Sequence, residues 1–368
     1  MINDTNQTQT AGDNAQQIQG QNVTIINQIG ITEQRAREID AELYAIAKRD
    51  FSYEAEQKID ERVRKLEDRV IPRLSHIEGA LQNFADPSFQ VFLTKANKAA
   101  ACTDRESDYD LLSELLVHRI EKKNSRKDQV GLNRAVEVVD QITDEALSGL
   151  TVFFAVDQLF AMSPSLEKGL TLLNDLYKKL PISNLPTDQR WLDELDILDA
   201  VRVSSIGELK KFEDFWPDQY SGYVSNGIRK DGENWSEVVK ILNECGLSTN
   251  ILVPNILLEN YVLLPIANES HIDTLKRNVV SDGKKIQVPI FENQKIAIHK
   301  IFSMYDKSPD LMNKVKKSFV EILDTFEAIK TVRLWWNSIP QAITVTAVGR
   351  VLAHANAKRC DPSVPNLN

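Results

Sequence analysis

The sequence has few of the features that mark an exported or disulfide-stabilised protein. Its 368 residues include three cysteines, Cys102, Cys245 and Cys360, which lie far apart and form no CxxC pair. This spacing predicts neither a disulfide framework nor a zinc site. The polar start MINDTNQTQTAGDN lacks the basic residues and the apolar stretch of a signal peptide. We therefore expect isolated, reduced thiols and a cytoplasmic protein.

The common fingerprints of nucleotide-binding and hydrolytic enzymes are also missing. No GxxxxGK[ST], GxGxxG or GxSxG motif occurs, and the five histidines show no HxxxH or HExxH spacing. The sequence therefore predicts no cofactor and no metal, and it favours a non-enzymatic protein. An active site assembled from distant residues would leave no local motif, so an enzyme remains the alternative.

The chain has no large excess of one sign of charge, and it has no apolar run long enough to span a membrane. The 44 Lys and Arg against 53 Asp and Glu give a net charge of -9, which argues against a surface that coats nucleic acid. The most apolar run, LSGLTVFFAVDQLFAM at 147–162, is shorter than the roughly 20 residues of a membrane span and contains Asp157. It predicts a buried helix and no transmembrane span, with a membrane-perturbing role as the alternative.

The first 30 residues form a polar segment rich in Gln, Asn, Thr and Gly. In QNVTIINQIG, apolar side chains fall mainly on one side of an extended chain, which predicts a strand over 23–29 bounded by Gly20 and Gly30. A lone strand leaves backbone groups unpaired, so its partner comes from far along the chain or from another copy. Ladders of Gln and Asn side chains favour another copy. A polar tail without regular structure is the alternative.

After Ile31 the pattern changes to long, densely charged helices with a narrow apolar seam. Steps of three and four residues place Ile39, Leu43 and Ile46 on one helix and a second set, from Ile59 to Val70, on the next. Such a seam requires a partner helix. The predicted interface between copies of the chain therefore comprises Ile18, Val23, Ile25, Ile26, Asn27, Ile29, Ile39, Leu43 and Ile46.

The rest of the chain is predicted to form helices joined by short links, interrupted by one region of mixed helices and short strands. Asp86-Pro87, Thr143, Ser163-Pro164 and Ser308-Pro309 are helix-start signals, the last opening one long helix up to about residue 339. Between 183 and 290, Pro, Gly and β-branched runs predict short strands, including Val201–Val203. The predicted fold is mainly α, a multi-helix bundle with a small α+β module that is loosely winged-helix-like and an N-terminal β segment that pairs between chains.

This pattern predicts four regions. They are an oligomerisation strand at 1–30, a helical domain with long amphipathic helices at 31–182, a mixed α+β module at 183–290 and a C-terminal helical region at 291–368. Within the last region, Thr344 or Thr346 is expected to cap a final helix. Adjacent Trp335 and Trp336 point about 100° apart on a helix, so one is expected in the core and the other at an interface.

Three charged clusters allow a structural and a functional interpretation. A basic group at a helix end could contact phosphate, although basic residues are also favourable at a helix C-terminus. Its members are Lys122, Lys123, Arg126 and Lys127. The acids of DRESDYD suit a helix start better than a calcium loop. Acids at 193–199 could serve a metal-dependent nuclease, but no basic partner motif accompanies them.

Three stretches together carry a resemblance to known proteins. They are AGDNAQQIQGQNVTIINQIGITEQRAREI, YDLLSELLVHRIEKKNSRKDQVGLNRAVEVVDQITDEAL, and WLDELDILDAVRV with ITVTAVGRVLAHANAKR. They resemble a group of uncharacterised bacterial proteins, and the middle stretch is similar to the Abi-alpha type of abortive-infection, phage-defence protein. None of these stretches is a catalytic signature, so the resemblance implies a context and assigns no functional residue.

The leading expectation is therefore a homo-oligomeric scaffold or sensor in bacterial antiphage defence. Its partners would be copies of itself and a phage or defence-system protein. The alternatives are a toxic effector enzyme, such as a metal-dependent nuclease with a non-contiguous acidic site, and a membrane-perturbing effector.

Overall fold

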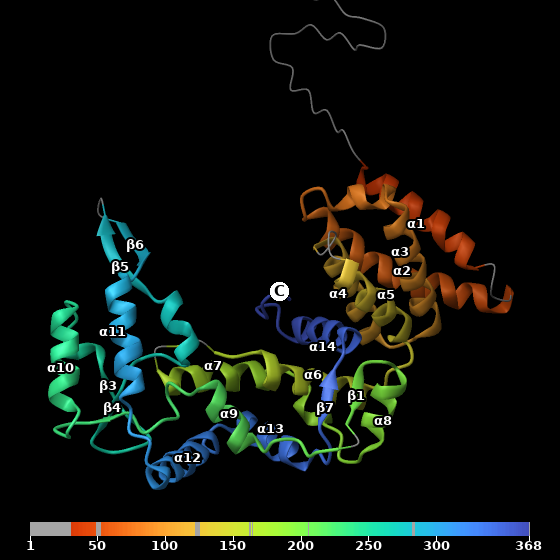
Figure 1. Cartoon of the computed structure of the whole chain (residues 1–368). Coiled ribbons are helices and arrows are strands. Elements are labelled where there is room, and N and C mark those ends of the chain that lie inside the picture. Colours follow the sequence, from red (N-terminus) through yellow and green to blue (C-terminus); the bar gives the residue numbers. More distant parts are fainter. Residues whose placement is uncertain are drawn as a thin grey trace, which may run out of the picture.

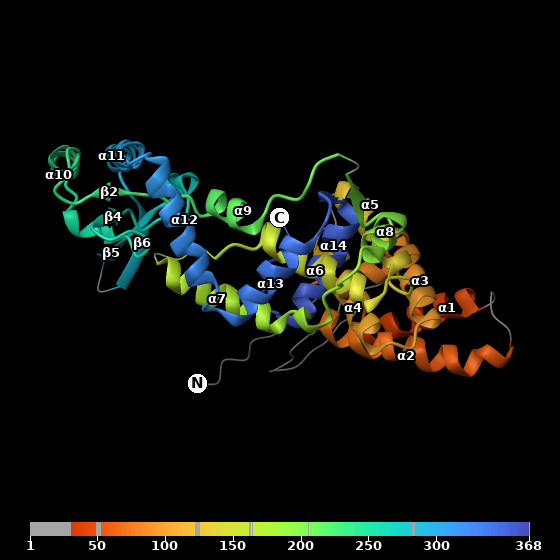
Figure 2. The ribbon, with the colours of Figure 1, turned by 90° about the horizontal axis from the view of Figure 1, so that it is seen from below.

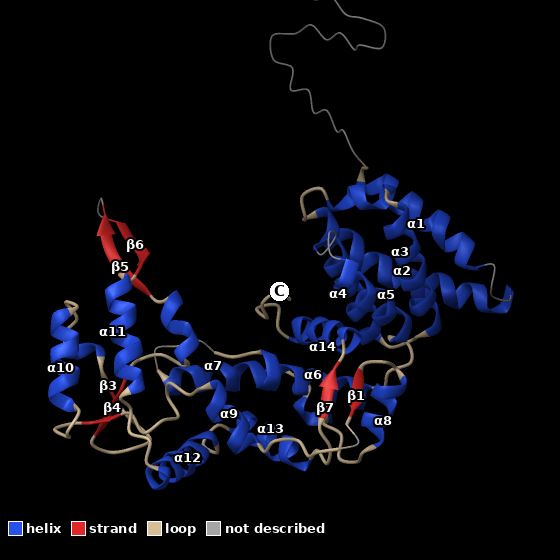
Figure 3. Cartoon of the chain, in the orientation of Figure 1, coloured by secondary structure: helices blue, strands red, loops and turns tan. Residues whose placement is uncertain are grey.

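The computed structural model is mainly helical, as the sequence predicts (Figure 3). It describes residues 31–48, 53–121, 126–161, 163, 165–204, 206–281 and 284–367. The first half contains helices α1 (Glu33–Lys48), α2 (Tyr53–Ser75), α3 (Pro87–Cys102), α4 (Glu106–Glu121), α5 (Arg126–Val138), α6 (Asp144–Gln158) and α7 (Leu166–Lys179). The predicted strand at 23–29 lies outside the described residues.

The second half alternates helices with short strands. The helices are α8 (Arg190–Ile197), α9 (Phe212–Gln219), α10 (Trp235–Glu244), α11 (Glu292–Ser303), α12 (Pro309–Leu323), α13 (Glu327–Ser338) and α14 (Ala347–Cys360). The strands are β1 (Val201–Val203), β2 (Ile228–Arg229), β3 (Val253–Pro254), β4 (Tyr261–Leu263), β5 (Lys276–Ser281), β6 (Lys284–Pro289) and β7 (Ile343–Val345). Short 3₁₀ turns are η1 (Ala80–Ala85), η2 (Ile182–Asn184), η3 (Thr249–Ile251) and η4 (Glu269–Thr274).

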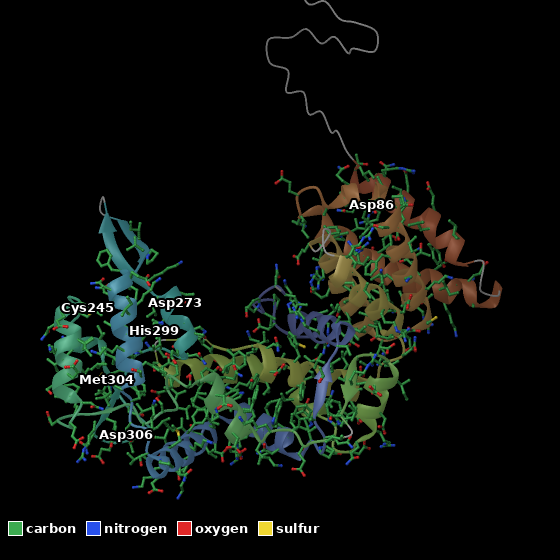
Figure 4. The ribbon with its side chains drawn as sticks, viewed as in Figure 1. Asp86, Cys245, Asp273, His299, Met304 and Asp306 are labelled. Atoms are coloured by element: carbon green, nitrogen blue, oxygen red, sulfur yellow. The ribbon has the colours of Figure 1, made fainter. Side chains whose placement is uncertain are left out.

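The elements gather at two ends of an elongated molecule. Helices α1–α5 form one end, and α10, α11 and strands β3–β6 form the other, with α7, α9, α12 and α13 between them (Figure 1). The view from below shows the same separation (Figure 2). The side chains labelled at the second end, among them Cys245, His299 and Asp306, come from the segments around α10 and α11 (Figure 4).

The larger core extends from α1 to α14 and is centred on α6. Residues 146–156 of α6 are buried throughout, which confirms a buried helix over most of the apolar run. The helix ends at Gln158, before the predicted end at residue 162, and residues 159–161 are partly buried and non-helical. Helix α14 returns from the far end of the sequence to pack on α4, α5 and α6. No helix among the described residues is long and apolar enough to cross a membrane.

Three predicted helix starts are confirmed by N-cap hydrogen bonds, in which a polar side chain accepts from backbone N–H groups of the first helical turn. Asp86 accepts hydrogen bonds from the first turn of α3, Thr143 from the first turn of α6 and Thr346 from the first turn of α14. The expected single helix from Pro309 to about residue 339 is wrong. The chain leaves helical geometry at Phe326, which is extended, so α12 and α13 are separate helices.

The strands form three small antiparallel sheets. β1 has the predicted bounds, but it pairs with β7, from beyond α13. β2, β4 and β3 form a second sheet over a smaller core around Val238, Leu242 and Ile301. The β5–β6 hairpin was not expected. Between α10 and β3 lies only the three-residue turn η3, too short for a recognition helix that enters a DNA groove.

Candidate functional site

The residues predicted to join copies of the chain divide into two groups. Ile18, Val23, Ile25, Ile26, Asn27 and Ile29 lie outside the described residues. Of the other three, Ile39 is buried, Leu43 is partly buried against the core and Ile46 is 54% exposed. The seam of α2 finds its partners within the chain, because α2 packs against α1, α3 and α4. Among the three described interface residues, Ile46 is therefore the one with an exposed side chain.

Helix α1 is fixed to the body at several points along its length. The backbone N–H of Ile31 donates to Oε1 of Gln82 at 3.1 Å. Arg37 and Glu67 form an ion pair between α1 and α2 at 2.6 Å. These contacts hold the segment that follows residue 30 in one place on the protein.

A buried carboxyl group completes this attachment. Asp40, 4% exposed, accepts a hydrogen bond from Nδ2 of Asn97 on α3 at 2.8 Å. Burial raises the pKa of Asp40 to about 6, an effect that the Asn97 hydrogen bond and the charge of Arg37 only partly offset. The ionised form of Asp40 is disfavoured at this site, so we expect the attachment of α1 to weaken as the pH rises through about 6.

The acids of DRESDYD have structural roles. Glu106 bonds Lys65 at 2.9 Å and Arg69 at 2.6 Å, and these hydrogen bonds hold the pKa of Glu106 below its usual range. Asp108, buried, accepts hydrogen bonds from Thr103 at 2.6 Å and from Arg105 at 3.0 Å. This cluster joins α4 to α2 and to the turn before α4.

The acids at 193–199 likewise connect elements. Glu194 accepts from the backbone N–H and the hydroxyl of Thr143, at 2.6 and 2.9 Å, and so ties α8 to the start of α6. Asp199 pairs with Arg202 at 2.8 Å and with Arg134 of α5 at 3.4 Å, and the hydrogen bond from Arg202 lowers the pKa of Asp199. Within the described ranges, no group of three or more His, Cys, Asp or Glu residues is placed to hold a metal ion.

The basic group predicted to contact phosphate is described only in part. Lys122 and Lys123 lie outside the described residues, and Lys127 lies in α5 with an undescribed side chain. Arg126, at the start of α5, is exposed. Arg119, nearby in the sequence, turns inward, where its guanidinium lies 5.6 Å from the ring centre of Phe92 and burial lowers its pKa.

Both tryptophans of the Trp335-Trp336 pair belong to the core, so the expectation that one lies at an interface is wrong. Their exposed fractions are 8% and 2%. Trp335 donates to the carbonyl of Pro186 at 3.0 Å and Trp336 to that of Lys210 at 2.9 Å. Trp336 also stacks on Phe153 and Phe215, with ring centres 4.7 and 5.5 Å away.

Two neighbouring cavities open around the C-terminal end of α6. The larger, about 530 Å³, lies between α6, α7, α14 and the segment 361–367. The smaller, about 370 Å³, is bounded by β7 and by aromatic side chains of α6, α9 and α13. Phe154, Gln158 and Arg350 line both cavities. Neither cavity leaves a local signal in the sequence, because the walls of each come from segments more than 150 positions apart.

The floor of the larger cavity is apolar and its rim is charged. Phe154, Leu173 and Val364 are buried beneath it. At the rim Lys179 pairs with Asp361 at 2.8 Å, and this ion pair, with hydrogen bonds from Ser363, lowers the pKa of Asp361. The ion pair closes the segment after α14 against α7.

Comparison with known proteins gives a family but no activity. A family model described only as “:-like” matches residues 30–367. The chain belongs to this uncharacterised family. No curated protein and no solved structure matches the chain. The family match begins at residue 30, immediately before α1, so it covers the helical body and both cavities but not the polar N-terminal segment.

Proposed function

We propose that this protein is a non-enzymatic homo-oligomer that acts as a scaffold or sensor in bacterial antiphage defence. Its N-terminal strand, residues 23–29, hydrogen-bonds to another copy and sets the assembly. The observation that carries this proposal is the firm attachment of Ile31 and α1 to the body, through the contacts to Gln82, Glu67 and Asn97. Because this strand ends shortly before the fixed Ile31, its pairing with another copy also holds the two helical bodies together.

The environment of the charged clusters supports an interaction role over the nuclease alternative. Of the four acids considered for a nuclease site, Asp193, Glu194, Asp196 and Asp199, the last three already bond Thr143, Arg202 and Arg134. Metal binding would have to replace these contacts. The membrane-perturbing alternative would require α6 to leave the centre of the core, where burying a single large aliphatic or aromatic side chain contributes roughly 1.5–3 kcal/mol.

Light scattering coupled to size-exclusion chromatography tests the assembly. We expect the full chain to form an oligomer and a chain that begins at Ile31 to be a monomer with unchanged circular dichroism. The matched control is Ala45→Ser, which alters an exposed side chain of α1 outside the predicted interface and leaves the strand intact. An oligomer of unchanged size after truncation would refute the role of the N-terminal segment.

A phage challenge tests the defence role. Bacteria that produce the full chain are expected to reduce the plating efficiency of at least one phage, and the chain that begins at Ile31 is expected to lose this protection. Equal protection by both chains would show that assembly through the segment is not required.

A further inference from the structure

The sheet of β1 and β7 has two strands, so within the described residues the outer edge of β7 pairs with no further strand. Each strand contributes three residues, and the two run antiparallel. Helix α8 packs against β1, and β1 lies between β7 and α8 (Figure 1). A two-stranded sheet is marginally stable, and a third strand strengthens it. The outer edge of β7 is where a third strand can be added.

The hydrogen-bond pattern shows which backbone groups of β7 face that edge. The N–H of Ser204 donates to the carbonyl of Ala342 at 2.9 Å, and the N–H of Thr346 donates to the carbonyl of Ala200 at 3.0 Å. In an antiparallel pair, every second residue bonds the partner strand. The intervening residues, Ile343 and Val345, therefore direct their N–H and C=O groups away from β1. Such outward groups are a template for another strand.

The smaller cavity lies beside the same edge and can receive side chains from an added strand. Ile343, Thr344 and Val345 of β7 line it, together with the aromatic side chains of Phe215 and Trp336. Its volume is about 370 Å³, whereas a cavity of roughly 150 Å³ already holds benzene. The space therefore accommodates more than one aliphatic side chain.

The N-terminal segment has the pattern that this edge and cavity require. The predicted strand places Val23, Ile25 and Ile29 on one side, and no charged residue occurs from Asn14 to Thr32. The cavity is lined by charges of both signs, including Asp157 and Arg350. Amide side chains both donate and accept hydrogen bonds, so a segment rich in Gln and Asn suits such a surface without burying an unpaired charge.

We propose that residues 23–29 of one copy add as a strand to the outer edge of β7 in a second copy. Aliphatic side chains from one side of the strand occupy the smaller cavity. This proposal rests on the proposed assembly through the N-terminal segment and names its acceptor. It replaces contact between identical N-terminal strands by contact between a strand and the body of the next subunit.

Photo-crosslinking of the full-length protein tests the acceptor. A benzophenone-bearing residue replaces the exposed Thr344, and a ¹⁵N-labelled preparation is mixed and re-equilibrated with an unlabelled one before irradiation. We expect mass spectrometry to find cross-links from position 344 to residues 14–30 that carry the other label. The matched control places the same residue at Leu334, which is 53% exposed on α13, and should give no cross-link to that segment.

A second variant separates the two proposals. Val345→Pro removes one outward N–H and leaves the residues that bond β1 unchanged, so we expect normal circular dichroism but loss of the oligomer. If truncation at Ile31 dissociates the oligomer while Val345→Pro does not, β7 is not the acceptor and the proposed assembly stands. If truncation has no effect, the proposed assembly itself is wrong.

The cross-linking result tests whether β7 is the acceptor even if Val345→Pro unfolds the protein. Cross-links from position 344 to residues 14–30 within one label only would show pairing inside a single chain and overturn the proposal. An oligomer that gives no cross-link from position 344 to that segment would also overturn it.

Discussion

Replacing Asp40 by asparagine should stabilise the protein at neutral pH and flatten its pH dependence. Asp40 belongs to α1 and bonds Asn97 of α3. It is 4% exposed, and burial raises its pKa from an ordinary 3.8 to about 6. The folded state therefore binds a proton more tightly than the unfolded state. The stability that this proton confers is fully present below pH 3.8 and is lost as the pH rises through about 6.

The size of the effect follows from the pKa. Each pKa unit corresponds to about 1.4 kcal/mol, so the charged Asp40 costs the folded protein at most about 3 kcal/mol at pH 7. Asparagine has the shape of the protonated acid and carries no charge. It can also exchange a hydrogen bond with the Asn97 amide, so Asp40→Asn should recover about 1–3 kcal/mol at pH 7 and little at pH 4.

Urea unfolding followed by circular dichroism from pH 4 to pH 7 measures this difference. The control is Asp68→Asn, which removes an exposed carboxylate of the neighbouring helix α2. Using the difference between each variant and the unmodified chain cancels the titration of other groups. A constant difference across this range, or a less stable Asp40→Asn protein at pH 7, would refute the assignment of a raised pKa to burial between α1 and α3.

Two further substitutions test the packing that positions β7 and the two cavities. Gly349→Ala would place a Cβ 2.0 Å from the carbonyl oxygen of Ala200 and should destabilise the protein by about 2 kcal/mol or more in urea unfolding. Its control, Gly169→Ala, meets no atom closer than 3.7 Å and should stabilise α7 by about 0.5–1 kcal/mol. The opposite order would contradict the close contact between α14 and Ala200, the residue before β1. Arg333→Met removes a largely buried guanidinium that bonds two carboxylates, and we expect a loss of about 3 kcal/mol. Lys316→Met, which removes a more exposed ion pair, should cost less than about 1 kcal/mol, and equal losses would show that burial of Arg333 is unimportant.

Local signals in the sequence identified many elements of the fold. Helix caps such as Asp86 and Thr143 act through neighbouring N–H groups, and the uninterrupted apolar character of 146–156 indicates a buried helix. These features depend on residues a few positions apart. They are visible without knowledge of the fold.

Long-range pairing could not be predicted in the same way. β1 was expected, but its partner β7 lies about 140 residues later and is only three residues long. The break between α12 and α13 at Phe326 follows no Pro or Gly signal. The seam of α2 was visible, yet whether another copy or the chain itself covers it depends on the placement of α1, α3 and α4.

A proline in the N-terminal strand tests the central claim most directly. Ile25→Pro removes a backbone N–H and fixes the backbone within the predicted strand, while the remainder of the polar segment is kept. Thr8→Pro, before the strand, is the matched control. Native mass spectrometry of the full chain should show an oligomer for the control and a monomer for Ile25→Pro. An oligomer of the same size in both variants would contradict assembly through this strand.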